Sequence, residues 1–243
     1  MGPCLSIITV CYNDLSNLRI TYNSIRSQTY QNVQTIIVDG GSKDGTLNFI
    51  QENREMITDY ISERDQGLYD AMNKGFDLVR GDYLIFLNAG DTFHTRDVIE
   101  IAMNQSNQAD VVYGDAILVN ENHTYKSGYH KITPKTLTWK DFKLGMVVCH
   151  QAMMVKPAVA ARYNLEYKIC ADIDWAINTL KKATSSRYID IVVCDFQAGG
   201  ISTQRKKLAW WERWKILLKH YGILSTVNSH IQFLINRTKF KLN

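Results

Sequence analysis

Two groups of acidic and small residues, each directly after an apolar run, carry the clearest sign of chemistry in this chain. Asp39 closes the apolar run 33–38 and begins a glycine-rich stretch, and Asp91 lies shortly after the apolar run 83–87. Short apolar runs that end at Asp and Gly are typical of buried parallel strands, and α/β sheets bind their ligands at the carboxyl ends of such strands. Carboxylates there, beside glycines that let a ligand approach the backbone, indicate a site for a nucleotide and a metal ion.

Alternating strands and helices in the first half must position these residues. Apolar runs and 3.6-residue periodicity predict a parallel sheet with helices on both faces. The expected strands are 5–12, 33–39, 57–62 and 82–87, and the expected helices are 14–28, 46–53, 68–79 and 96–105.

The second half changes character. We expect a pair of strands, 111–119 and 124–129, joined by a turn, and a further strand, 146–155. A helix that begins with two aspartates, 172–182, a last strand, 188–194, and an amphipathic helix, 208–221, should follow. The composition shifts near residue 203, which divides the chain into a body, 1–203, and a basic, Trp-rich tail, 204–243.

Bulk composition excludes several classes of protein. The 243 residues are 45% hydrophobic and 21% charged, as in ordinary globular domains, and no run reaches the length of a membrane span. Five scattered cysteines and an N-terminus that runs directly into a strand lead us to expect reduced thiols, no signal peptide and a cytoplasmic location. The tail carries +8 within a total of +4, leaving −4 on the body. This basic charge predicts an anionic partner for the tail, which could be a phospholipid surface, a diphosphate group or nucleic acid.

Several motifs occur together in a recognisable order. They are SIITV at 6–10, DGGSKDGT at 39–46, SERDQGLYDAMNKG at 62–75, LNAGD at 87–91, HQA at 150–152, ADID at 171–174 and GGIST at 199–203. In this order they resemble family 2 glycosyltransferases with the GT-A fold, and in particular the bacterial branch of colanic acid and O-antigen enzymes. The resemblance spans about residues 4–203.

The resemblance implies a GT-A, Rossmann-like, mostly parallel sheet and an inverting hexosyl transfer from a nucleoside diphosphate sugar, with UDP as the expected nucleotide. It implies that the ends of the first two strands and the segment entering the third helix hold the donor. The residues expected to bind it are Thr9, Tyr12, Asp14, Asp39, Asp70, Asn73, Asn88, Ala89 and Gly90. The alternatives from local chemistry are a helix N-cap for Asp14, a turn for Asp39 and a solvated first turn for the pair Asp70 and Asn73.

Two aspartates receive the central roles in this resemblance. Asp91 matches the last acid of the family's metal motif, and Mn²⁺ or Mg²⁺ can bind through one carboxylate together with substrate phosphates. Asp172 matches the base that takes the proton from the acceptor hydroxyl. Met72 stands where many relatives carry a phosphate-facing Arg. A simple capping role is the alternative for both aspartates.

Weaker roles follow for three further sets of residues. His150 and Gln151 are expected at the sugar, with a structural His as the alternative. Trp175 could stack on a sugar ring and Asp174 could support the site, and core packing is the alternative for Trp175, Trp139 and Tyr129. The residues expected to bind the diphosphate are Ser202, Arg205 and Lys206, with a solvated linker as the alternative.

The tail gathers its aromatic and apolar residues on one side of the predicted helix 208–221. Trp with Lys and Arg is the composition of an interfacial helix. We therefore expect a lipid-linked or oligosaccharide acceptor, with polyprenyl diphosphate as the expected lipid carrier in bacterial surface polysaccharide synthesis. We also expect peripheral contact with the inner face of the cytoplasmic membrane, and no nucleic acid. The alternatives are packing of this face on the catalytic domain or on a second subunit in a homodimer.

Two other classes of protein compete with an active glycosyltransferase. A nucleotidyltransferase should show a Gly-rich, basic loop after the first strand, and Val10 to Asp14 is not one. A catalytically inactive nucleotide-sugar-binding or membrane-associated interaction module would explain the depleted metal motif, but retention of both Asp91 and Asp172 argues against it. A dinucleotide-binding oxidoreductase lacks its G-x-G-x-x-G signature here.

Overall fold

The computed structural model describes residues 2–120, 122–128, 133–199 and 205–239. Its sheet has the strand order β3-β2-β1-β4-β8-β6-β9-β5, with β7 paired to β6. The strands are β1 Leu5–Cys11, β2 Val33–Asp39, β3 Asp59–Ser62, β4 Tyr83–Phe86, β5 Thr92–Phe93, β6 Val111–Val119, β7 Tyr125–Gly128, β8 Met153–Val155 and β9 Ser186–Gln197. The helices are α1 Leu15–Arg26, α2 Thr46–Glu52, α3 Leu68–Asp77, α4 Val98–Gln105, η1 Trp139–Leu144, η2 His150–Ala152, α5 Ala171–Lys182 and α7 Lys206–Lys239.

The first four strands in the sheet order are parallel, as the sequence predicts. β1 pairs in parallel with β2 and β4, and β2 pairs in parallel with β3. The short β8 then runs antiparallel to both β4 and β6, and β9 returns parallel to β6. The predicted strand 146–155 is wrong over most of its length, because only Met153–Val155 pairs in the sheet and His150–Ala152 forms a 3₁₀ turn.

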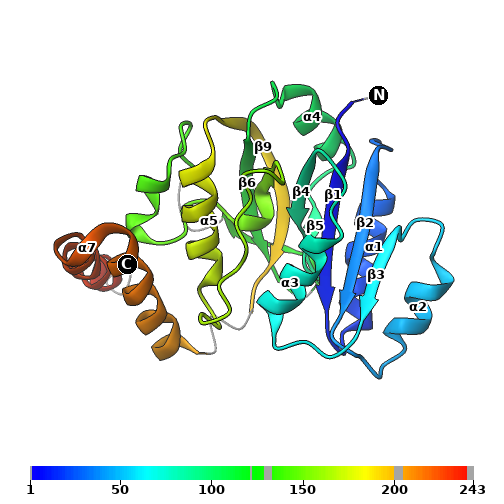
Figure 1. Cartoon of the computed structure of the whole chain (residues 1–243), viewed down its shortest axis with the longest axis horizontal. Coiled ribbons are helices and arrows are strands. Elements are labelled where there is room, and N and C mark those ends of the chain that lie inside the picture. The colour runs from blue at the N-terminus through cyan, green and yellow to red at the C-terminus, as the bar shows by residue number, and fades with distance from the viewer. Residues whose placement is uncertain (1, 121, 129–132, 200–204, 240–243) are drawn as a thin grey trace.

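Alternate residues of each central strand supply two different cores. Ile8 and Val10 of β1 face a cluster built with α3, α5 and the start of α7. Leu5 and Ile7 face a cluster that includes α4. Helices therefore cover both faces of the sheet, which is why the central strands read as continuous apolar runs. Figure 1 shows α7 beside α5, at the opposite end of the molecule from α2.

The tail is one helix by its hydrogen bonds but two by its geometry. Gly222 adopts φ 77° and ψ 173°, which breaks the helix between residues 221 and 223. The second half then folds back, since His230 packs 5.1 Å from the Trp210 ring and 4.7 Å from the Trp214 ring. The sequence indicated only the first of these two helices.

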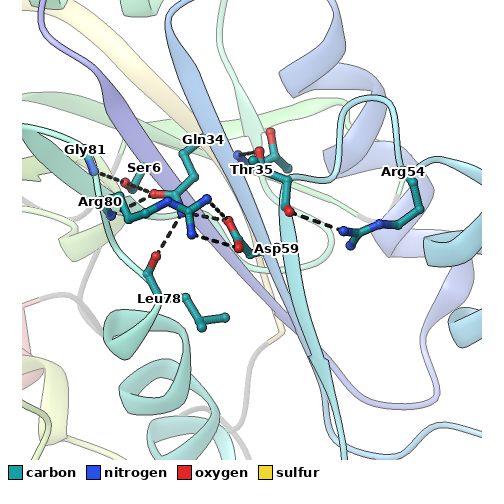
Figure 2. A network of polar contacts seen from close by, with 9 residues as sticks. Ser6, Gln34, Thr35, Arg54, Asp59, Leu78, Arg80 and Gly81 are labelled. Atoms are coloured by element: carbon teal, nitrogen blue, oxygen red, sulfur yellow. Dashed lines mark hydrogen bonds and ion pairs between the residues drawn. The ribbon is translucent and has the colours of Figure 1, made fainter.

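A buried glutamine ties together the amino-terminal edge of the sheet, as Figure 2 shows. The Gln34 carbonyl oxygen accepts from the Ser6 hydroxyl at 2.6 Å and from the Arg80 backbone N–H at 2.9 Å. Its amide nitrogen donates to Asp59 at 2.8 Å and to the Leu78 carbonyl at 2.9 Å. Every polar position of this side chain is therefore satisfied, at the edge of the sheet away from the strand ends that carry Asp39 and Asp91.

We expect Gln34→Ala to lower the free energy of unfolding by about 2–4 kcal/mol, because it removes four hydrogen bonds and leaves the buried Ser6 hydroxyl without its acceptor. Urea denaturation would measure the loss. The exposed Gln31, whose amide contacts only nearby backbone carbonyls, provides a matched control in Gln31→Ala. Equal stability of the two variants would contradict the role assigned to Gln34.

Candidate active site

The carboxyl ends of β1, β2 and β4 meet at one edge of the sheet. Cys11 pairs with Asp39 across β1 and β2, and the Gly40 N–H donates to the Cys11 carbonyl at 3.0 Å. The Ala89 N–H donates to the Val10 carbonyl at 3.3 Å. The sheet therefore brings the two predicted groups, 39–46 and 87–91, to the same edge.

Asp39 is fully buried at this edge, and its neighbours fix its carboxylate. The Ser62 hydroxyl donates to it at 2.7 Å, the Ser42 N–H donates at 3.1 Å, and the Ser42 hydroxyl also donates to it. These contacts orient the carboxylate without a ligand. Binding of the nucleotide sugar by Asp39 stays a prediction. The same holds for the buried Thr9, whose hydroxyl has no hydrogen-bond partner among the described residues.

The loop after β1 combines an exposed ring with a well-held backbone. Tyr12 is 64% exposed. Asn13 is left-handed, with φ 47°; its N–H donates to the Ser42 hydroxyl at 2.7 Å and its side-chain oxygen accepts from the Lys43 N–H at 2.8 Å. Asp14 precedes α1 but makes no capping bond, and Asp44 accepts from the Leu15 N–H at 2.8 Å instead.

The segment that enters α3 lies beside this loop. A Cβ atom on Gly40 would stand 2.6 Å from an Asp65 carboxylate oxygen and 3.1 Å from the Tyr12 ring. Asp65 is therefore a polar neighbour of the predicted donor loop that sequence reasoning did not single out. Its only sequence signal was its place in the run 62–75.

The other two residues predicted on this segment make internal contacts. Asp70 accepts from the Gln66 N–H at 2.9 Å. Both ends of the Asn73 amide bond the backbone of Tyr163, each at 2.9 Å. Asn73 thus joins α3 to the segment before α5, and this contact accounts for its amide without a ligand.

The loop from Asn88 to Asp91 is organised by α1. The buried Thr21 hydroxyl donates to the Asp91 carbonyl at 2.8 Å and accepts from the Gly90 N–H at 3.0 Å. Gly90 has φ 97°, and a Cβ atom there would lie 2.3 Å from the Gln197 side-chain oxygen, so only glycine fits. The sequence analysis did not find this support, because a threonine on an apolar helix face looks like any other core position.

Asp91 is 4% exposed and directed at β9 and η2. The Gln197 N–H donates to its carboxylate at 2.7 Å. Burial raises the pKa of Asp91 to about 7, and hydrogen bonds from the Gln197 backbone and the Gln151 side chain lower it only in part. The carboxyl group therefore changes charge near neutral pH.

Asp91 has one candidate co-ligand for a metal in the same loop. The Asn88 side-chain oxygen is buried and has no hydrogen-bond donor among the described residues. The described ranges hold no group of three His, Cys, Asp or Glu residues arranged for a metal ion. One carboxylate and one amide oxygen fit a Mg²⁺ or Mn²⁺ that shares its coordination with substrate phosphates, and do not fit a cation held by protein alone.

Asp172 lies at the amino-terminal end of α5. Its carboxylate accepts from the Ile173 N–H at 2.9 Å. Burial raises the pKa of Asp172 to about 6, against the lowering effects of that N–H and of the Arg213 charge. A carboxylate of this kind is ionised at neutral pH and is a stronger base than an exposed one.

Hydrogen bonds and electrostatic interactions relate Asp91 to Asp172 through η2. Gln151 donates to Asp91, and the adjacent His150 has its Nδ1 3.1 Å from the Tyr163 hydroxyl. Tyr163 is buried, and its pKa is raised by burial first and then by the nearby Asp172 charge. Burial also lowers the pKa of His150 to about 4, so its imidazole is neutral. The two carboxylates thus belong to one connected region.

The packing identifies the partners of two residues with weaker predicted roles. Trp175 is 0% exposed, stacks on Tyr163 at 5.5 Å and meets Phe86 edge-on, so the core alternative describes it and sugar stacking does not. Asp174 is 1% exposed and holds the tail: His220 bonds it at 2.7 Å and Lys219 at 3.0 Å.

The remaining predicted residues are only partly located. Tyr129 and Ser202 lie outside the described residues, and Arg205 and Lys206 are exposed where α7 begins. Trp139 stacks on Tyr221 of α7 at 5.5 Å, so it too follows the packing alternative.

Comparison with known proteins adds family information to this geometry. A model described as "Glycosyl transferase family 2" matches residues 6–162. A "PGL/p-HBAD biosynthesis glycosyltransferase" of Mycobacterium bovis is 32% identical over 212 residues, which cover 83% of this chain and 80% of that protein. The putative glycosyltransferase EpsH of Bacillus subtilis is 28% identical over 112 residues, 45% of this chain and 33% of that protein.

Solved structures share the fold. S. aureus TarS 1–349 in complex with UDP superposes with a TM-score of 0.72 at 14% identity, covering 89% of this chain. This chain spans 64% of the length of that TarS structure. The mannosyltransferase PcManGT from Pyrobaculum calidifontis, in complex with GDP-Man and Mn²⁺, superposes with a TM-score of 0.59 at 16% identity, covering 90% of this chain and 63% of that one.

Proposed function

Since the chain belongs to glycosyl transferase family 2 and is a glycosyltransferase, we propose that it transfers one hexose from a UDP-sugar to a saccharide hydroxyl with inversion at the anomeric carbon. The observation that carries the proposal is that Asp172, a partly buried carboxylate at the start of α5, and Asp91 both interact with one buried group of side chains, Gln151, His150 and Tyr163. The two chemical groups that such a transfer needs, a base and a site for the leaving diphosphate, then lie in one region.

The proposed step uses Asp172 as the base. Its carboxylate takes the proton of the acceptor hydroxyl while the hydroxyl oxygen forms a bond to C1 of the donor sugar. The bond from C1 to the diphosphate oxygen breaks, and its electron pair leaves with the nucleoside diphosphate. Attack opposite the leaving group inverts the configuration, and no covalent enzyme intermediate is needed.

Asp91 is proposed to hold Mn²⁺ or Mg²⁺ together with the Asn88 oxygen. When bound, such a cation supplies charge neutralisation for the departing diphosphate. The Mn²⁺ in the PcManGT complex supports this choice, and the UDP in the TarS complex supports UDP as the nucleotide. The residues proposed to contact the nucleotide are those at the ends of β1 and β2, chiefly Tyr12 and Asp39, with Asp65 beside them.

For the acceptor, we propose a lipid-linked saccharide, on polyprenyl diphosphate, at the cytoplasmic face of the membrane. Its place in glycolipid or polysaccharide synthesis is supported by the relative named for PGL/p-HBAD biosynthesis. Incubation with a panel of UDP- and GDP-sugars, Mn²⁺ and synthetic lipid-diphosphate acceptors tests the proposal. Release of UDP that depends on the acceptor is expected. Tight UDP binding without turnover on any acceptor would instead identify an inactive nucleotide-sugar-binding module.

The second half of α7 presents the surface proposed to meet the membrane. Leu224 is 85% exposed, and Ile223, Val227 and Ile231, spaced along the same helix, are 40–54% exposed. The tail carries a net charge of +8, which complements an anionic lipid surface. No helix among the described residues is long and apolar enough to cross a bilayer.

We expect the double variant Leu224→Ser, Ile231→Ser to bind phosphatidylglycerol vesicles about 10-fold or more weakly than the wild type, because each change removes an apolar side chain from the contact. Vesicle flotation would measure it. Tyr125→Ser, which removes a ring that is 64% exposed on β7, is the matched control. Unchanged flotation of the double variant would contradict the proposed membrane contact. A dimer that this variant disrupts would instead indicate that the surface binds a second subunit.

A further inference from the structure

The first half of α7 covers the backbone that leads into α5. Glu212 of α7 is 4% exposed, although it is a charged residue in a helix with exposed neighbours. One of its carboxylate oxygens accepts from the Lys168 N–H at 2.7 Å. The other accepts from the N–H groups of Ile169 and Cys170, both at 2.9 Å.

These three N–H groups belong to residues two to four positions before Asp172 in the chain. Helix α5 begins at Ala171, and its N-cap residue, Cys170, makes no side-chain capping bond. The first N–H groups of a helix need acceptors, and a negative charge at this end is favourable. Glu212, 42–44 residues further along the chain, places a negative charge at this end and accepts the N–H of the N-cap Cys170. Its bonds to Lys168 and Ile169 hold the two residues just before the helix, and all three are charge-assisted hydrogen bonds.

Helix α7 also bonds α5 at a second point, on the other side of Asp172. Asp174 is bonded by His220 at 2.7 Å and by Lys219 at 3.0 Å, both from α7. Burial raises the pKa of Asp174, but the bonds from His220 and Lys219 outweigh it and hold the pKa below its usual value. The Cys170 thiol also reaches the Ala209 carbonyl at 3.4 Å. The residues on both sides of Asp172 are thus attached to the same helix.

We infer that Glu212 is a positioning residue for Asp172, so that the tail helix forms part of the support of the active site. The inference rests on the proposed function, in which Asp172 is the base. Glu212 itself does not touch the reacting atoms; it fixes the backbone from which Asp172 reaches them. Other charged or titratable groups that interact with Asp172 are Tyr69 of α3, Tyr163, Cys170 and Arg213.

The test is Glu212→Gln, which keeps the size of the side chain but removes its charge and one acceptor oxygen. We expect kcat to fall about 10- to 10²-fold, because a small misplacement of a base is costly, while KM for the nucleotide sugar stays within about 2-fold. The low-pH limb of the rate profile should move to lower pH, because the Glu212 charge raises the pKa of Asp172. Hydrogen exchange at the amides of residues 168–170 should accelerate.

Glu166→Gln is the matched control, because Glu166 is exposed on the same segment and its carboxylate accepts a hydrogen bond from the Asn164 amide instead of from the backbone before α5. It should keep wild-type kcat and the wild-type pH profile. If Glu212→Gln does not fold, a second variant is available. His220→Asn, which weakens the hydrogen bond from α7 to Asp174, should lower kcat and leave KM unchanged.

The outcomes separate this inference from the proposed function. Wild-type kcat and pH profile in Glu212→Gln, with Asp172→Asn inactive, would overturn the positioning role alone. A parallel loss of kcat and donor binding would indicate a general structural role and would also overturn it. An Asp172→Asn variant as active as the wild type would overturn the proposed function itself.

Discussion

Replacing Asp172 with asparagine is expected to lower kcat by about 10²- to 10⁴-fold, the range that a positioned base contributes. The asparagine can still accept the Ile173 N–H, so the start of α5 should keep its structure. KM for the nucleotide sugar should change little, because Asp172 is assigned to the acceptor hydroxyl. Steady-state release of UDP, measured with a fixed acceptor, gives both constants.

The pH dependence of the same pair of proteins provides a second measurement. The wild-type rate should rise with pH through about 6 and then level, because Asp172 must lose its proton to act as a base. The residual rate of Asp172→Asn should lack this limb. Glu55→Gln, a matched change at an exposed position beyond α2, should leave rate and profile unchanged. A wild-type limb retained in Asp172→Asn would exclude Asp172 as the base.

Replacing Asp91 with asparagine is expected to have opposite effects on activity and on stability. Activity should fall by about 10²-fold or more, since the cation that Asp91 is proposed to hold contributes several kcal/mol. Added Mn²⁺ should raise the melting temperature of the wild type in the presence of UDP and should not raise that of Asp91→Asn. Both readouts depend on the carboxylate, and only the second is independent of turnover.

The stability effect follows from the raised pKa of Asp91. A carboxyl group whose pKa is higher in the folded state favours folding most below its unfolded value, and this contribution is lost as pH rises through the folded value. For Asp91 the window runs from 3.8 to about 7, and ionisation of the buried group costs on the order of 4 kcal/mol. At pH 8 without metal, Asp91→Asn should therefore be more stable than the wild type, and at pH 4 the difference should vanish.

An asparagine at this position also finds partners. Its carbonyl can accept the Gln197 N–H, and its amide can donate to the Gln151 oxygen, which is buried and has no donor among the described residues. Chemical denaturation at the two pH values measures the difference. A destabilised Asp91→Asn at pH 8 would contradict the assigned burial cost.

The strands that sequence predicted best are those whose ends are marked by turn residues. β2 and β6 have the predicted bounds, because Asp, Gly and Asn follow apolar β-branched runs there. Met146 to Cys149 reads as the same kind of run but forms no strand. Val148 and Cys149 are buried by contacts of the loop with the cores, and burial produces an apolar sequence whether or not the backbone pairs in a sheet.

The strand-end carboxylates could be predicted because parallel strands present their carboxyl ends at one edge, a rule that depends only on element order. The supporting residues could not. Thr21, Gln151 and Glu212 each act on a residue at least 42 positions away, and nothing in their local sequence separates them from ordinary core or surface residues. Asp174 was expected to support the site and Trp175 to stack on a sugar or pack in the core, and the structure gives them partners in α7 and in Tyr163 that local sequence does not show.

The attachment of α7 to α5 also determines which segments a fragment or a chimera of this chain must include together. The family match ends at residue 162, ahead of Asp172 and well ahead of Glu212. A fragment trimmed to that match would lack Asp172, the proposed base, and Glu212, the residue proposed to position it. A chimera in which the last 40 residues are exchanged to bind a new acceptor saccharide would lose Glu212, whose carboxylate bonds the backbone before α5. In chimeras of this chain, α5 and α7 should therefore be exchanged together.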